Sequence, residues 1–169
     1  KLQNEKFNIE RLVQESKKPR HTDSGVIVEN IDNCMTKFAR CCYPVPGDPI
    51  VGYITKGFGV SVHREDCPNV SPNGQEGRWI NVSWAPENAM TYETRFEITS
   101  HDRDGVVVDI VTAMAALKVK VQSLNARILP DNYALVDMTL LVKDRQQLLE
   151  VKNRISRINS IIEVKRSNG

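Results

Sequence analysis

The spacing of hydrophobic and polar positions changes character between residues 86 and 90. Before this point the apolar residues alternate with polar ones in short runs bounded by Gly and Pro, which is typical of strands. Strands are predicted at 25–28, 50–55, 59–63 and 78–84. The segment 31–40 fits a strand or a short helix, and Lys56-Gly57-Phe58 predicts a hairpin turn. The pattern therefore predicts a small β-rich unit over residues 24–86.

Beyond residue 90 helical spacing appears between the alternating runs. Strands are predicted at 92–99, 119–129, 134–142 and 161–164. Apolar residues at helical spacing predict two amphipathic helices, one over 107–117 and one over 148–158. Asp104 stands where the first helix would take its N-cap. The order βαββαβ over residues 90–166 predicts a ferredoxin-like unit, so the whole chain is expected to be an α+β protein.

The ends and the composition narrow the class of protein. Residues 1–23 are polar with a weak helical stripe, and we expect a helix remnant followed by a linker. The chain starts at Lys1 without a signal-peptide pattern, so we expect a piece of a longer polypeptide. No apolar run approaches the length of a membrane span. A net charge of +2 is too small to indicate nucleic-acid binding by itself.

Three of the four cysteines gather with a histidine in two short blocks: Cys41, Cys42, His63 and Cys67. Thiolates and imidazole are the ligands that Zn²⁺ prefers in tetrahedral structural sites. His63 and Cys67 are four residues apart, which one helical turn would bring to the same face. Adjacent cysteines can reach one metal only if the backbone bends sharply. The alternatives are a metal-free domain with buried thiols, or a redox role for the cysteines.

The two blocks also carry a resemblance. The sequences ARCCYPVPGD at 39–48 and VSVHREDCPN at 60–69 resemble the cysteine-rich (RIS) domain of long RelA/SpoT homologues, the stringent-response enzymes that make and degrade (p)ppGpp. The loop Asp102–Gly105 and the apolar helix after it resemble the ACT domain that follows in that family. This resemblance implies that the catalytic hydrolase and synthetase domains lie outside the chain. Four cysteines without a secretory signal favour a reducing compartment, so we expect a cytoplasmic location.

The resemblance implies contact with the ribosome and tRNA through the first unit. The basic residues near the cysteine cluster that we expect to contact RNA are Lys37, Arg40, Lys56 and Arg64. Basic groups interleaved with aromatic ones suit RNA backbone and exposed bases. The alternative is that these charges form an ordinary solvated face. We further assign Asp66 and Cys67 a regulatory role.

In the second unit we expect a pocket for a branched-chain amino acid, a ligand class of the ACT family. Its expected residues are Asp102, Asp104, Gly105, Val106 and Asn125. The free N–H groups of a helix N-terminus near Gly105 would receive the ligand carboxylate. Val106-Val107 stands where bulkier leucines are usual, which leaves the ligand preference open. The alternative is an empty ACT domain that serves for docking or for homodimer formation.

No nucleotide-binding loop, carboxylate cluster or nucleophile–base pair stands out in the sequence. We therefore expect no catalytic site in this chain, and the resemblance implies a regulatory fragment of a GTP diphosphokinase. It would sense ribosome or tRNA state and control the catalytic domains. The competing hypotheses are an amino-acid-sensing or dimerisation module without RNA contact, and a metal-dependent enzyme that uses the Cys/His site.

Overall fold

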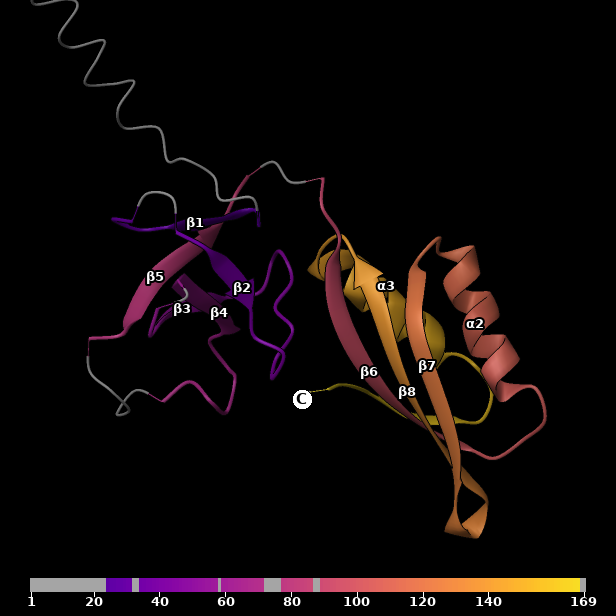
Figure 1. Ribbon diagram of the computed structural model, residues 1–169. Helices are drawn as coiled ribbons and strands as arrows, with labels where there is room; N and C mark the ends of the chain where they lie inside the picture. Colours follow the sequence, from indigo (N-terminus) through magenta and orange to yellow (C-terminus); the bar gives the residue numbers. More distant parts are fainter. Residues whose placement is uncertain (1–23, 32–33, 58, 72–76, 87–88, 168–169) are drawn as a thin grey trace, which may run out of the picture.

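The computed structural model describes residues 24–31, 34–57, 59–71, 77–86 and 89–167. The helix remnant and linker expected over 1–23 lie outside these residues, as does Phe58 of the expected hairpin turn. The described chain forms two sheets, and its helices pack only on the second one (Figure 1). None of its described helices combines the length and the apolar character needed to cross a membrane.

The first sheet has five strands in the order β1-β5-β3-β4-β2. The strands are β1 (Val26–Val28), β2 (Thr36–Phe38), β3 (Ile50–Thr55), β4 (Gly59–Arg64) and β5 (Trp79–Trp84). Their inward side chains form a core of buried valines and Ile50. The ambiguous segment 31–40 contains a strand rather than a helix, because Thr36–Phe38 pairs in parallel with Val60–Val62 of β4. The other pairings in this sheet are antiparallel.

The second sheet has four antiparallel strands in the order β7-β8-β6-β9. Its elements are β6 (Tyr92–His101), α2 (Val106–Ala116), β7 (Lys120–Leu129), the 3₁₀ turn η1 (Pro130–Asn132), β8 (Tyr133–Val142), α3 (Arg145–Ser156) and β9 (Ile161–Arg166). Both helices cover the same face of this sheet (Figure 1). This is the predicted βαββαβ plan, and the α+β class is confirmed.

The start of helix α2 differs from the prediction. The N-cap residue is Gly105 rather than Asp104, and no side chain caps the helix. Gly105 has φ 80° and ψ 1°, a left-handed conformation that glycine adopts without a Cβ penalty. The chain therefore enters the helix through a conformation that glycine favours, and the N-cap falls one residue later than predicted. Strand β6 also continues to His101, two residues beyond its predicted end.

The two sheets meet at an aromatic junction. Phe38, Trp84 and Tyr92 pack with ring centroids 5.3–5.6 Å apart. The Tyr92 hydroxyl donates a hydrogen bond to the carbonyl oxygen of Ser24 at 3.1 Å. Val45, from the loop between β2 and β3, is fully buried within the core of the second sheet. The first unit thus contributes side chains directly to the packing of the second.

Candidate metal centre

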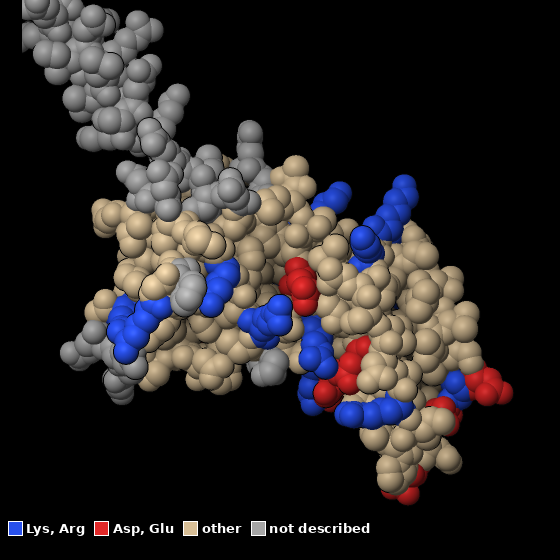
Figure 2. Space-filling model, viewed as in Figure 1, with Lys and Arg blue, Asp and Glu red and all other residues tan. Residues whose placement is uncertain are grey.

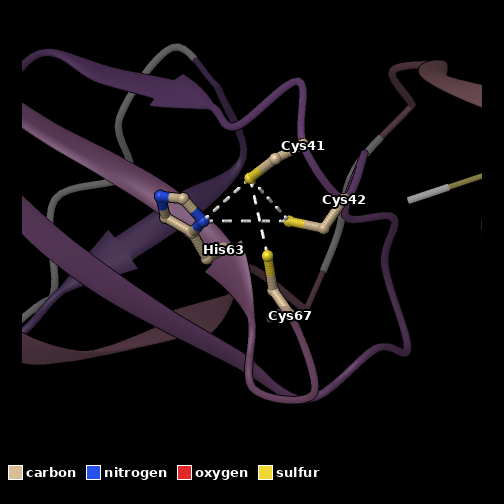
Figure 3. Close-up of side chains that lie close together, drawn as sticks. All are labelled: Cys41, Cys42, His63 and Cys67. Atoms are coloured by element: carbon tan, nitrogen blue, oxygen red, sulfur yellow. Dashed lines mark hydrogen bonds between the residues drawn. The ribbon is translucent and has the colours of Figure 1, made fainter. Parts of the chain in front are cut away.

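Four soft donor atoms from three segments of the first unit come together beside strand β4. Cys41 and Cys42 lie in the turn after β2, His63 lies in β4, and Cys67 lies just after the turn that ends β4. The four side chains point toward one another (Figure 3), and all their donor atoms lie within 4.8 Å of one another. The fold therefore brings together the four residues that were proposed as ligands from the sequence.

A sharp turn lets both adjacent cysteines face the same point. The Tyr43 N–H donates to the Ala39 carbonyl at 3.0 Å, which closes a single helix-like turn around the two cysteines. Tyr43 then takes a left-handed conformation with φ 45°. That conformation is uncommon for a residue with a Cβ and reverses the chain direction. The bend required by adjacent ligands is thus present.

The approach of His63 and Cys67 has a different origin from the predicted helical turn. His63 belongs to strand β4, where it pairs with Val51 of β3. The chain leaves the strand through a tight turn, in which the Cys67 N–H donates to the Arg64 carbonyl at 3.1 Å. The ladder with β3 extends as far as Arg64, so His63 belongs to the predicted strand and only the residues after it form the turn. The turn still places the donor atoms of His63 and Cys67 close to the two adjacent cysteines.

The donor distances fit a tetrahedral ion. The Cys41 sulfur is 3.3 Å from His63 Nδ1, 3.5 Å from the Cys67 sulfur and 4.0 Å from the Cys42 sulfur. The Cys42 sulfur is 3.9 Å from His63 Nδ1. With Zn–S bonds of about 2.3 Å in tetrahedral geometry, neighbouring sulfurs lie about 3.8 Å apart. The number, type and spacing of these donors therefore suit Zn²⁺.

Burial favours the protonated form of the Cys42 and Cys67 thiols when no cation is bound. Burial raises the pKa of Cys42 to about 12, although the Arg64 N–H that points at its sulfur acts in the opposite direction. Burial also raises the pKa of Cys67 and lowers the pKa of His63. A divalent cation at the centre of the four donors would reverse this balance by displacing the thiol protons. The cysteines would therefore ionise on binding a cation rather than exist as free thiolates.

Neighbouring groups hold the donors in place. The backbone N–H of Arg64 donates to the Cys42 sulfur at 3.3 Å. Ser61 Oγ lies 3.5 Å from His63 Nε2, and the Trp79 ring meets the imidazole edge-on with centroids 5.9 Å apart. Such contacts leave Nδ1 directed at the cysteines, which is how outer groups orient a metal-binding histidine. Cys34, the fourth cysteine, is not one of the grouped donors.

Three of the four basic residues expected to contact RNA are exposed. Lys37 lies in the edge strand β2, Arg40 precedes the cysteine pair, and Lys56 lies in the turn between β3 and β4. Lys and Arg side chains spread over the first unit from its outer end to the junction (Figure 2). These positions leave their charges available to an external partner.

Arg64 is placed differently from the other three. Its side chain is only 14% exposed and forms an ion pair with Asp66, in which Nε donates to Oδ1 at 2.8 Å. This hydrogen bond lowers the pKa of Asp66. Arg64 Nη1 is buried and has no hydrogen-bond partner among the described residues. Arg64 and Asp66 therefore stiffen the turn between His63 and Cys67, and Arg64 is not presented as a free cation.

A cavity of about 330 Å³ lies at the N-terminal end of helix α2, between the helix and strand β7. Asp102, Gly105 and Val106 line it as expected. The other lining residues, which were not among the named candidates, are Arg103, Val107, Val108, Ala126, Arg127, Ile128 and Ala134. The cavity matches the volume of a small-molecule site.

Asp104 and Asn125 do not line this cavity. Asn125 pairs with Asp137 across the sheet, whereas its neighbour Ala126 pairs with the core residue Val136. Because side chains alternate along a strand, Asn125 faces away from the helices. The alternation of β7 could have indicated Ala126 and Ile128 in its place.

Comparison with known proteins places these two units in a family. The family model of the RelA/SpoT RIS domain matches residues 26–85, and that of the ACT domain matches residues 88–166. The GTP pyrophosphokinase of Escherichia coli K12 is 34% identical over 167 residues, which cover 95% of this chain and 22% of that protein. The bifunctional (p)ppGpp synthase/hydrolase RelA of Mycobacterium tuberculosis is 35% identical over 152 residues, which cover 89% and 21% of the respective chains.

The solved ACT domain of the GTP pyrophosphokinase of Chlorobium tepidum overlaps with 45% of this chain and 97% of its own, with a TM-score of 0.41 and 13% identity. The chain spans about a fifth of the length of the curated relatives it matches. The two family models and the relatives nevertheless agree along nearly the whole sequence. The chain belongs to the RelA/SpoT family of GTP pyrophosphokinases and carries the RIS and ACT domains of that family.

Proposed function

We propose that this chain is a regulatory region of a GTP pyrophosphokinase and that a structural zinc ion shapes its RIS domain into a surface for RNA. The observation that carries the proposal is the group of four soft donors that ties the turn at Cys41-Cys42 to the turn at Cys67. Four protein ligands leave no open position for substrate, which disfavours the alternative of a metal-dependent enzyme at this site. Catalysis then belongs to parts of the relatives that this chain does not match.

The zinc would act on the fold. It would join two surface turns that follow the paired strands β2 and β4. Arg40 directly precedes Cys41, so the ion would also fix the direction of a basic side chain. Asp66 and Cys67 would exert their regulatory role through the same turn, since Asp66 pairs with Arg64 between the two metal donors. Metal binding and RNA binding would thus depend on one local structure.

The partner we propose is RNA of the ribosome and tRNA, contacted by Lys37, Arg40 and Lys56. Exposed cations bind phosphates with an affinity that falls steeply with salt. In the full-length protein, the double substitution Arg40→Glu with Lys56→Glu should abolish co-sedimentation with ribosomes at physiological salt. Lys120→Glu, on exposed strand β7, is the matched control and should leave co-sedimentation unchanged. Equal sedimentation of the double variant and the wild type would refute RNA contact through this surface.

The cavity beside helix α2 supports a second function, binding of a branched-chain amino acid. Its lining is mostly apolar, and its charged residues are Asp102, Arg103 and Arg127. Ala126→Phe would fill the cavity, whereas Asn125→Phe would add the same ring to the opposite face of β7. Calorimetry with valine and isoleucine should give heat for the wild type and for Asn125→Phe, and none for Ala126→Phe. Absence of heat from the wild type at millimolar ligand would favour an empty ACT domain.

A homodimer through the ACT domain would use strand β7. This strand is the edge of the described sheet, and exposed apolar side chains lie along it and along α2: Val108, Val111 and Ile128. An edge strand beside apolar surface can pair with a second copy. Sedimentation analysis of the full-length protein and of an Ile128→Lys variant tests this. The variant should be monomeric if β7 forms the interface, and a wild type that stays monomeric at high concentration would refute it.

A further inference from the structure

The loop that carries the adjacent cysteines also contacts the second domain at several points. Past Cys42, Val45 is fully buried in the core of the ACT domain. The Pro46 carbonyl accepts a hydrogen bond of 2.7 Å from the backbone N–H of Arg145, the first residue of α3. At Gly47 the loop passes so close to α3 that an added Cβ would lie 3.0 Å from the Cβ of Arg145. The loop is thus inserted into the second domain.

An arginine from the last strand clamps the same loop. Arg166 of β9 donates from Nη1 to Asp48 Oδ1 at 3.0 Å and from Nη2 to Asp48 Oδ2 at 2.7 Å. Nη2 also donates to the Tyr43 carbonyl at 2.5 Å. The side chains of Arg166 and Asp48 are 14% and 4% exposed. A two-point, charge-assisted pair in such surroundings is strong while it is intact, and its separation leaves two charges poorly compensated.

Asp48 also organises the loop itself. Its Oδ2 accepts a hydrogen bond of 2.9 Å from the backbone N–H of Val45, and its carbonyl accepts one of 2.9 Å from Trp84 Nε1. The loop between the cysteine turn and β3 has no helix or strand of its own. Its shape therefore depends on what holds it at each end. Cys41 and Cys42 lie at the first end of the loop, and the ion pair of Asp48 with Arg166 holds the other end.

We propose that the metal-binding state of the cysteine cluster controls how firmly the ACT domain docks on the RIS domain, through the loop Cys41–Asp48. The proposal rests on the zinc site proposed above. When Cys41 and Cys42 bind the ion, the Tyr43 carbonyl next to them is held where Arg166 reaches it. When the ion leaves, the turn is free to change and the contacts of Val45, Pro46 and Asp48 weaken with it. Linkage requires the reverse effect as well, so docking strengthens zinc binding.

Zinc affinity measured by competition with a chromophoric chelator tests the reciprocal effect. Arg166→Ala should weaken zinc binding about 10-fold, within the usual range of coupling between sites. Arg166→Lys keeps the charge but loses the two-point geometry and should have an intermediate effect. Lys165→Ala is the control, because Lys165 is exposed and pairs with Glu163 of its own strand. This control should bind zinc as the wild type does.

Amide hydrogen exchange of the wild type tests the direct effect without any substitution. Removal of zinc with EDTA should speed exchange of the Arg145 amide several-fold, because its acceptor is the Pro46 carbonyl of the loop. The Leu148 amide, which donates to Asp144 within α3, should exchange at an unchanged rate.

The outcomes separate the two proposals. A wild type that binds no zinc would overturn both of them. Zinc binding with equal affinity in wild type and Arg166→Ala, and with an unaltered Arg145 amide, would overturn the coupling alone and leave the zinc site standing. Where Arg166→Ala does not fold, Arg166→Lys and the exchange measurement still decide.

Discussion

The backbone of Gly59 lies directly against the carbonyl of Met35, and a Cβ built on this glycine would be 2.0 Å from that oxygen. The same carbonyl accepts a hydrogen bond of 2.8 Å from the N–H of Val60, which joins β2 to β4. Gly59 also has φ 89°, where L side chains are strained. Only glycine permits the strand pairing that brings the segment before the cysteines beside the strand that carries His63.

Gly59→Ala should therefore lower the free energy of unfolding by about 4 kcal/mol, because strain and a backbone clash combine. Gly57→Ala is a matched control, since Gly57 has φ 86° but its added Cβ would have no neighbour within 4 Å. Its cost should be about 1–2 kcal/mol from conformation alone. Urea unfolding of the three proteins measures both values, and equal losses would contradict the role of the Met35 contact.

The zinc proposal predicts a difference between cysteines. Cys42→Ser should remove stoichiometric zinc from protein purified without added metal and should lower the thermal midpoint, because metal binding contributes directly to folding. The Cys34→Ser variant should bind as much zinc as the wild type and unfold at the same thermal midpoint, since Cys34 is half-buried and lies outside the donor group. Elemental analysis and calorimetry check both. A well-folded wild type without zinc would favour the metal-free alternative.

Tyr92 predicts a specific loss of stability at alkaline pH. Burial raises the pKa of its phenol above the ordinary value of 10.0. The folded protein therefore holds the phenol proton more tightly than the unfolded chain, and this stabilisation is complete below pH 10 and is lost as the pH rises through the folded-state pKa. Tyr92→Phe should be about 1 kcal/mol less stable at pH 8, where the hydrogen bond to Ser24 is lost.

The difference in stability between the wild type and the Tyr92→Phe variant should then shrink above pH 10. Unfolding in denaturant at a series of pH values measures it. A constant difference from pH 8 to pH 11 would show that ionisation of Tyr92 has no influence on folding.

Thr94 offers a stabilising substitution. It is fully buried in β6, and its hydroxyl has no hydrogen-bond partner among the described residues. Thr94→Val keeps the shape and removes this cost, so it should raise the free energy of unfolding by about 1 kcal/mol. Thr112→Val is the control. The exposed Thr112 hydroxyl donates to the Val108 carbonyl at 2.7 Å, so its removal should not raise the free energy of unfolding. Destabilisation by Thr94→Val would point to a partner for the hydroxyl.

Much of the fold was predictable because most elements show the hydrophobic spacing of a strand or a helix. The alternation of Ala134, Val136 and Met138 predicted β8, and the spacing of Leu148, Val151 and Ile155 predicted α3. Both signals come from which face of a single element is buried, and neighbouring residues suffice to reveal them. The segment 31–40 was ambiguous because β2 is only three residues long and exists through its pairing with β4.

The four donors of the candidate metal centre were named from residue type and spacing, whereas the roles of their neighbours were not. Arg64 looked like a free cation until its ion pair with Asp66 was visible. Asn125 looked like a pocket residue until the register of β7 turned it to the other face. In both cases the residue type was informative, but the direction of the side chain decided its use.

By itself the sequence determined most of the elements, the βαββαβ order, the donor set and the family, because each of these depends on residues close together or on a motif read in order. The tertiary structure alone decided that Asp48 and Arg166, 118 residues apart, form a pair that joins the loop of the cysteines to the last strand of the ACT domain. No local pattern marks such a pair. Its partners are chosen by how the two sheets pack, and packing is a property of the whole chain.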